Sequence, residues 1–366
     1  MENKKIRIAI THGDTNGIGY ELIFKTFAET EMLEMCTPIV YGSPKVAAYH
    51  RKALDIPANF SIISRAEDAQ DGRLNVLTSI EEEVKVDLAL PTEESGKAAV
   101  KALDRAIDDG RNGLYDALVV GPMTNACLMG GNEHAGNIAD YLGRKFENKN
   151  GGLTIMSSYK MRVASVNENV DMRKAVGNIT RGLIEKKATT MFTAMKRDFL
   201  LSNPRVALLA LNPSGKGEEE TNIMKPLVEE LEEKGIMVFG PYAAEQFFGQ
   251  GDYEAFDGIL AMYDDQGIVP MKMLNTDTAT RLITGLPVAC TLPEVDDIFT
   301  NAGRCMADES ELRQAIYCAI DVARNRAKYD ESHRNPLPKL FHEKKDDSEK
   351  VRFAVPKNKE TKATEE

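Results

Sequence analysis

Short apolar runs alternate along this chain with longer segments of helical period, and this alternation constrains the fold more than any other feature. The apolar runs predict strands at residues 6–11, 38–42, 74–78, 117–121, 153–157, 162–166, 205–211, 237–240 and 258–263. Apolar residues three and four positions apart predict helices at residues 20–29, 45–54, 95–109, 180–200, 219–234 and 309–329. Strands that alternate with helices favour crossover connections and a mostly parallel sheet covered on both faces.

Length and composition define the class of protein. The 366 residues exceed what one compact core usually holds, so two domains are expected. The net charge of −11 disfavours a nucleic-acid surface, and the apolar run at residues 6–10 is too short for a signal peptide or a membrane span. Five cysteines without a Cys-x-x-Cys pair are typical of reduced thiols in a cytoplasmic protein. Residues 343–366 form a polar tail that we expect to be disordered.

A glycine-containing loop follows the first predicted strand and runs into a predicted helix. It reads Thr11-His12-Gly13-Asp14-Thr15-Asn16-Gly17-Ile18-Gly19. Glycines allow a tight turn and a close approach of the backbone to a ligand, and a helix N-terminus offers free N–H donors. The spacing differs from the Gly-x-Gly-x-x-Gly of dinucleotide-binding proteins, so a structural turn and a ligand loop both remain open. His12 has the same two interpretations.

Four motifs occur in order along the chain. They are the glycine loop, Val120-Gly121-Pro122, Ala210-Leu211-Asn212-Pro213 and Ala261-Met262-Tyr263-Asp264-Asp265-Gln266-Gly267. Together they resemble the 4-hydroxythreonine-4-phosphate dehydrogenases of pyridoxal phosphate biosynthesis, over about residues 5–330. The resemblance implies an α/β fold of two α/β/α domains with an interdomain cleft, as in isocitrate and isopropylmalate dehydrogenases. It implies one domain at residues 1–127 with 306–335, a second at 128–305, and a homodimer whose subunits share the cleft.

The resemblance also implies a reaction and a metal. The family oxidises a phosphorylated hydroxy-amino acid with NAD, and the product then loses carbon dioxide. A divalent metal held by three histidines acidifies the alcohol and stabilises the enolate. The positions that match those histidines carry Asn169, Ser214 and Asp264. An amide, a hydroxyl and one carboxylate are poor substitutes for three imidazoles, so we expect the family metal to be absent here.

The substrate positions implied by the resemblance are changed as well. A phosphate-contacting His-Thr pair is matched by Ile138 and Ala139, whose aliphatic side chains cannot donate hydrogen bonds to a phosphate. A lysine is matched by Asn125, a substrate asparagine by Arg281, and an arginine by Cys290. We therefore expect weaker binding of a phosphorylated substrate.

Other positions keep the family pattern. Lys272 matches a lysine that contacts the substrate; burial would lower its pKa and suit it to acid–base catalysis, and a structurally paired lysine is the alternative. The positions assigned to NAD are Gly13, Asp14, Gly17, Gly19, Asn212, Pro213, Asp265, Gln266 and Gly267. Scaffold positions match the family while the metal and phosphate positions do not, which favours a lost activity on a retained fold.

Several side chains have two open interpretations. A new oxygen site for magnesium or manganese would use two acidic pairs, Glu168 with Asp171 and Asp264 with Asp265. Ordinary surface carboxylates are the alternative. His134 is either a relocated ligand or a solvated loop histidine. Cys290 is either a nucleophile or an inert buried thiol.

Three functions follow from these observations. In the first, the protein keeps the fold and a small-molecule cleft, lacks the family activity, and serves as a binding or regulatory protein. In the second, it is an NAD-dependent oxidoreductase that acts on a non-phosphorylated hydroxy acid. In the third, the ordinary family activity survives. The changed metal and phosphate positions favour the first.

Overall fold

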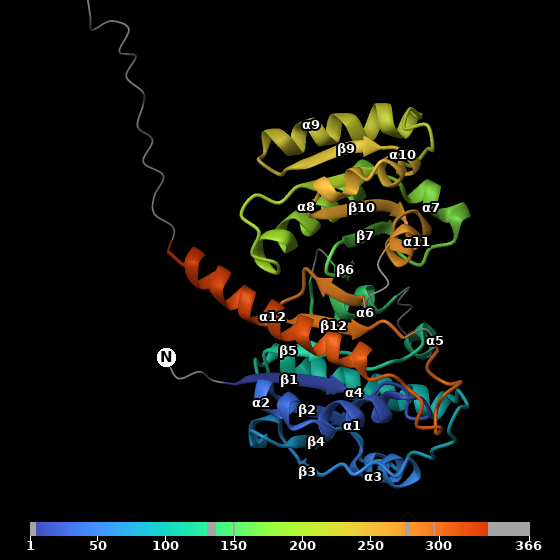
Figure 1. The fold of residues 1–366 in the computed structure, drawn as a ribbon, viewed down its shortest axis with the longest axis vertical. Helices are drawn as coiled ribbons and strands as arrows, with labels where there is room; N and C mark the ends of the chain where they lie inside the picture. Colours follow the sequence, from blue (N-terminus) through green and yellow to red (C-terminus); the bar gives the residue numbers. More distant parts are fainter. Residues whose placement is uncertain (1–4, 130–136, 149–150, 275–278, 296, 336–366) are drawn as a thin grey trace, which may run out of the picture.

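A computed structural model describes residues 5–129, 137–148, 151–274, 279–295 and 297–335, and it contains a twelve-stranded sheet (Figure 1). One half of this sheet is parallel throughout. Its strands, in spatial order, are β3 (Phe60–Ile63), β4 (Leu74–Thr78), β2 (Cys36–Gly42), β1 (Ile6–Thr11), β5 (Ala117–Val119) and β12 (Ala289–Pro293).

The other half of the sheet continues from β12 without a break. Its strands are β11 (Thr280–Thr284), β6 (Leu153–Ser157), β7 (Arg162–Asn167), β10 (Gly258–Tyr263), β8 (Val206–Leu209) and β9 (Val238–Tyr242). β11 is antiparallel to both β12 and β6, and β6 is antiparallel to β7. The outer strands from β7 to β9 are parallel. Two antiparallel strands therefore join two parallel halves.

Helices cover both faces of the first half of the sheet. Successive residues of a strand point to opposite faces, so neighbouring residues of one strand contact different helices. Ile8 and Ile10 of β1 pack with one set of helices, whereas Ala9 packs with the other. The first set is α1 (Gly19–Ala28), α2 (Thr30–Met35), α3 (Pro44–Ala53) and α12 (Ser310–His333). The second set is α4 (Glu93–Arg111), α5 (Asn125–Met129) and α6 (Ile138–Lys145).

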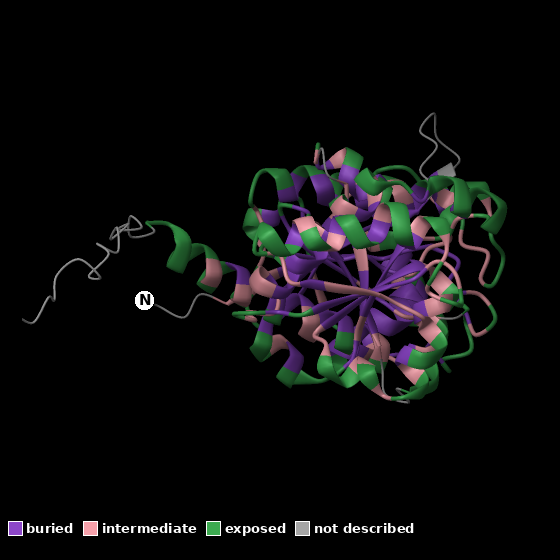
Figure 2. Ribbon diagram, turned by 90° about the horizontal axis from the view of Figure 1, so that it is seen from above, coloured by how far each residue is buried: buried purple, intermediate pink, exposed green. Residues whose placement is uncertain are grey.

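The second half is covered in the same way. On one face lie α8 (Arg181–Arg197) and α9 (Lys225–Glu233), which continues a π-helical segment at Glu220–Met224. On the other face lie α10 (Ala244–Gly249) and α11 (Asp264–Leu274). α7 (Met172–Asn178) follows β7, and short 3₁₀ helices lie at Ala66–Asp68 and Asp252–Ala255. Figure 2 shows the buried strands enclosed between these helical layers.

The structure confirms the predicted α/β fold and all nine predicted strands, and each predicted helix is present. Three strands were not predicted. β3 is a half-exposed edge strand, and β11 and β12 are short segments in which threonine, arginine and cysteine interrupt the apolar run. Such short mixed segments carry little periodic signal.

The division into two domains stays a prediction, because the sheet runs unbroken across both halves. Two elements from the segment 128–305 lie with the first half: β12 pairs with β5, and α6 packs in the same cluster as α4. The polar tail at 343–366 lies outside the described residues. No helix in the described part of the chain is long and apolar enough to cross a membrane.

Candidate functional site

A cavity of about 290 Å³ lies where β6, β7 and β11 meet the start of α11 and the first turn of α6. Seven positions singled out from the sequence line it: Asn125, Ile138, Glu168, Asn169, Asp264, Asp265 and Arg281. The fold thus brings together residues that are far apart in the chain. Since β7 and β10 are parallel neighbours, the residues that follow them meet at the same edge of the sheet.

Two of the three positions matched to family histidines lie against each other at this edge. Asn169 follows β7 with φ +53°, and its backbone N–H donates a hydrogen bond to Asp264 Oδ2 at 2.7 Å. Asp264 is the first residue of α11, directly after β10. Its second oxygen, Oδ1, is buried and has no hydrogen-bond partner within the described chain.

The third matched position, Ser214, does not line the cavity. Ser214 is exposed on the loop after β8, and its hydroxyl accepts a hydrogen bond from the backbone N–H of Lys216 at 3.3 Å. Of the three positions matched to family histidines, only the amide of Asn169 and the carboxylate of Asp264 line the cavity. Across the described ranges, no group of three or more His, Cys, Asp and Glu side chains is placed to hold a metal ion. The residues present therefore do not fit the family's three-histidine centre.

Glu168, which lines the cavity, and Lys187 of α8 influence each other's charge. Burial raises the pKa of Glu168, although the charge of Lys187 opposes the shift. Burial likewise lowers the pKa of Lys187, whose ammonium donates to the carbonyl oxygen of Gly152 at 3.1 Å. Glu168 and Asp265 line the cavity with Asp264, whereas Asp171 caps α7 by accepting from Arg173 N–H.

Lys272 is half-exposed and paired with Glu294. Its Nζ lies 3.0 Å from Glu294 Oε1, and it is not among the residues that line the cavity. Arg281 donates to the same carboxylate through Nε and Nη2. Burial would raise the pKa of Glu294, but the hydrogen bonds and charges of Arg281 and Lys272 hold it below its usual value. This geometry agrees with the interpretation of Lys272 as a structurally paired lysine rather than a catalytic one.

Ile138, Ala139 and Cys290 have different surroundings. Ile138 begins α6 and lines the cavity, and Asn137 caps this helix by accepting from Asp140 N–H at 2.8 Å. Ala139 and Cys290 are buried in the core of the first half. Burial raises the pKa of the Cys290 thiol to about 12, which favours the inert thiol over the nucleophile.

The glycine loop is buried and packed against its own chain. A Cβ added at Gly13 would lie 2.2 Å from Pro122 O, and one at Gly19 would lie 1.9 Å from His12 O. Asp14 accepts hydrogen bonds from Ser95 Oγ and from Asn16 N–H, and burial raises its pKa. These contacts match the structural interpretation of the loop, and its role in NAD binding stays a prediction.

His12 is fully buried and stacks on Tyr20, with ring centroids 5.3 Å apart. Burial, together with the nearby charge of His50, lowers the pKa of His12 to about 3. Neither ring nitrogen of His12 has a side-chain or backbone partner in the described chain. The imidazole is therefore neutral at physiological pH, in keeping with a structural role.

The remaining NAD positions also contact their own chain. Gln266 donates to Ala210 O at 2.6 Å and accepts from Met262 N–H, while Gly267 leaves no room for a Cβ beside Val163. Asn212 donates to the carboxylates of Glu219 and Glu220. Pro213 is exposed. Of all the positions assigned to NAD, Asp265 alone lines the cavity.

Sequence reasoning missed three groups that shape this site: Ser165, Lys187 and Glu294. Ser165 was visible as a polar residue within an apolar strand. Lys187 and Glu294 carried no signal, because a charged residue on a helix or after a strand is usually solvated. His134 lies outside the described residues.

The fold and the cavity define a class: an α/β protein with a candidate ligand site at the carboxyl ends of neighbouring parallel strands. The family model described as "Pyridoxal phosphate biosynthetic protein PdxA" matches residues 34–319. The chain belongs to this family.

Individual relatives agree with the family match. A 4-hydroxythreonine-4-phosphate dehydrogenase from Bacteroides thetaiotaomicron is 46% identical over 358 residues, covering 96% of this chain and 98% of the relative. A D-threonate 4-phosphate dehydrogenase from Cupriavidus necator is 30% identical, covering 87% of this chain and 98% of the relative. The solved 4-hydroxythreonine-4-phosphate dehydrogenase of Klebsiella pneumoniae superposes with a TM-score of 0.76 at 23% identity, covering 88% of this chain and 99% of the other. This likeness supports the fold.

Proposed function

We propose that this PdxA-family protein lacks the family's metal-dependent dehydrogenation and acts as a small-molecule binding or regulatory protein. One observation carries the proposal. Asn169 and Asp264 stand at the cavity where the resemblance places metal histidines, and Ser214, the third position, lies outside it. Without three strong ligands, the alcohol of a substrate would not be acidified.

The loss of phosphate-binding groups supports the same proposal. The names of both relatives specify a phosphorylated substrate. In this chain Ile138 and Asn125 line the cavity at the positions matched to a phosphate-contacting histidine and a lysine. An aliphatic side chain cannot compensate a desolvated phosphate.

An active NAD-dependent oxidoreductase is the alternative, either on the family substrate or on a non-phosphorylated hydroxy acid. Glu168 and Lys187 favour it, because their shifted pKa values are typical of groups that exchange protons during catalysis. Structural ion pairs shift pKa values in the same way.

A spectrophotometric assay decides between them. The purified protein is mixed with 4-hydroxythreonine-4-phosphate, NAD and zinc or magnesium, and NADH absorbance is followed, with the Bacteroides thetaiotaomicron enzyme as positive control. We expect no turnover, whereas active enzymes usually turn over about 1–1000 times per second. NADH formation at such a rate would refute the proposal. Calorimetric titration with NAD alone then tests whether the cofactor still binds.

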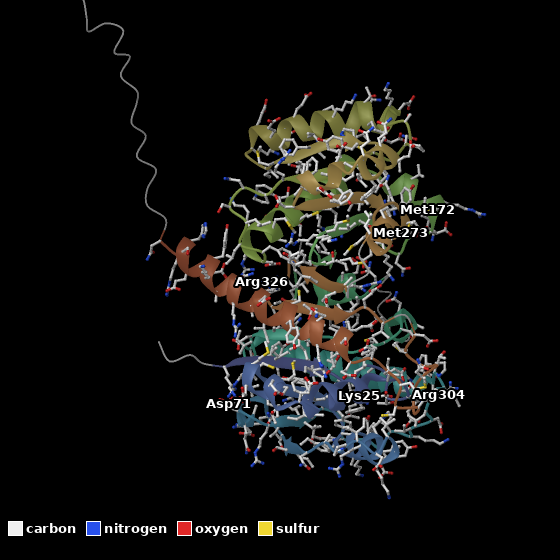
Figure 3. The ribbon with its side chains drawn as sticks, in the orientation of Figure 1. Lys25, Asp71, Met172, Met273, Arg304 and Arg326 are labelled. Atoms are coloured by element: carbon white, nitrogen blue, oxygen red, sulfur yellow. The ribbon has the colours of Figure 1, made fainter. Side chains whose placement is uncertain are left out.

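We also propose that the protein is a homodimer in the cytoplasm. The dimer is supported by a set of exposed apolar side chains on α7 and α11, near the cavity: Met172, Val176, Val269, Met273 and Leu274. Figure 3 labels Met172 and Met273. Light scattering after size exclusion should give twice the chain mass. Met273→Asp should shift the mass towards the monomer, and Met306→Asp, on an exposed methionine of the first half, should leave it unchanged.

A further inference from the structure

The cavity is rich in hydrogen-bond acceptors that the protein does not satisfy. Asp264 Oδ1 is buried without a partner in the described chain, and the same holds for the hydroxyl of Ser165. Ser165 is only 4% exposed, and both residues line the cavity. Buried polar atoms in native proteins are nearly always bonded, so unpartnered ones at a cavity indicate a missing partner.

The charges around the cavity are predominantly negative. Among the residues that the structure describes, Glu168, Asp264 and Asp265 line it, and Arg281 is the one lining residue with a positive side chain. Both Nε and Nη2 of Arg281 are directed to Glu294, which lies outside the lining, so much of its charge is already compensated. Carboxylates outnumber the guanidinium along the described lining, so an anionic ligand would be repelled and a cationic ligand would be attracted.

The size and the apolar part of the wall limit the ligand further. Ile138, Met156 and Ile268 provide apolar surface beside the carboxylates. The volume of about 290 Å³ is at the lower end of small-molecule pockets. A short aliphatic molecule fills this space while its polar group reaches the carboxylate side.

We propose that the cavity binds a short aliphatic molecule that carries an ammonium and a hydroxyl group, and that it selects against phosphorylated ligands. The ammonium group lies against Asp264 and Glu168, and the hydroxyl group bonds with Ser165. This inference rests on the proposed function, because it assigns a ligand class to the same site in a protein without the family metal.

Calorimetric titration of the full-length protein tests the inference with four probes. Serinol (2-amino-1,3-propanediol) carries the proposed groups, glycerol lacks the ammonium, and phosphoethanolamine keeps the ammonium but carries a phosphate in place of the hydroxyl. Magnesium chloride tests an oxygen site for a metal. We expect saturable binding of serinol and binding at least about 10-fold weaker for glycerol and phosphoethanolamine, because a charge-assisted hydrogen bond is lost or a repulsion is added. Stronger binding of phosphoethanolamine, saturable magnesium binding, or no serinol binding at 10 mM (roughly the weak end of ligand affinities) overturns the inference.

Two substitutions assign the binding to this site. Asp264→Asn should weaken serinol binding by about 10-fold or more, and Glu168→Gln should weaken it in the same direction. Glu229→Gln, on an exposed glutamate of α9 away from the cavity, is the matched control and should leave it unchanged. Circular dichroism confirms that each variant is folded, and unchanged serinol binding in both folded site variants contradicts the proposal. NADH formation in the dehydrogenase assay refutes the proposed function separately, whatever serinol does.

Discussion

The glycine loop and the cavity both contain buried polar groups, but the chain surrounds them differently. At the loop, backbone atoms occupy the space that a side chain at Gly13 or Gly19 would need, and Asp14 is bonded by its own chain. At the cavity, about 290 Å³ stays open and Asp264 keeps an oxygen without a partner in the described chain. The space in the loop is therefore filled by its own chain, whereas the cavity keeps the room and polarity that a ligand requires.

The largest expected effect on stability comes from adding a side chain inside the packed glycine loop. Gly19→Ala should lower the free energy of unfolding by about 4 kcal/mol, because its Cβ would lie 1.9 Å from a backbone oxygen. Gly177→Ala is the control: Gly177 lies in α7 with open space around it and should gain up to about 1 kcal/mol. Urea unfolding measures both. Similar values for the two variants would show that the loop is not tightly packed.

The next effect concerns a buried ion pair that joins the two halves of the sheet and lies in neither the glycine loop nor the cavity lining. Arg326 of α12, labelled in Figure 3, donates to both oxygens of Asp198, which also accepts from Thr284 Oγ1 at 2.6 Å. Asp198→Ala should cost about 3 kcal/mol, because it leaves a buried guanidinium uncompensated. Asp330→Ala, which removes the partly exposed pair with Arg197, should cost less than about 1 kcal/mol. Equal losses in urea unfolding would contradict this difference.

A pH effect should come from the packed loop. His12 has a pKa of about 3 in the folded protein, against 6.5 as its ordinary value. The unfolded chain therefore binds a proton more readily, so stability falls as the pH drops from 6.5 towards 3, by about 1.4 kcal/mol per pH unit. The loss in unfolding free energy between pH 7 and pH 5 should be about 2 kcal/mol smaller in His12→Asn. His333→Asn, at an exposed position, should keep the full loss.

The smallest expected effect is a gain in stability rather than a loss, and it comes from a substitution at the cavity. Ser165→Ala removes a buried hydroxyl that has no partner in the described chain, so it should raise the free energy of unfolding by up to about 1 kcal/mol. Thr284→Val removes a hydroxyl that does donate a hydrogen bond, and it should lower stability by about 1 kcal/mol. Thermal unfolding compares the two. A loss in Ser165→Ala would mean that its hydroxyl is bonded in solution.

Much of the architecture was predictable from the sequence, because buried parallel strands are continuous apolar runs and covering helices repeat every three or four residues. β1, β4, β6 and β10 have the predicted bounds. β11 and β12 were missed because their position is determined by pairing across the sheet rather than by local pattern.

The site was predictable only in part. The motif match identified Asn169, Asp264 and Arg281, which the fold brings to one cavity. It could not show that Ser214 lies elsewhere or that Glu294 pairs with both Lys272 and Arg281. Those facts depend on how loops and side chains from distant elements are placed, and no spacing along the chain encodes that.

The antiparallel strands β11 and β6 have a mechanical consequence. The halves are joined at mid-sheet by the ladders from β12 through β11 to β6, so their relative movement must deform paired backbone. Swinging one half open on a flexible connection would break these hydrogen bonds, whereas a small change of sheet twist would keep them. Access to the cavity should therefore be governed by small torsional adjustments of the strands that form its floor.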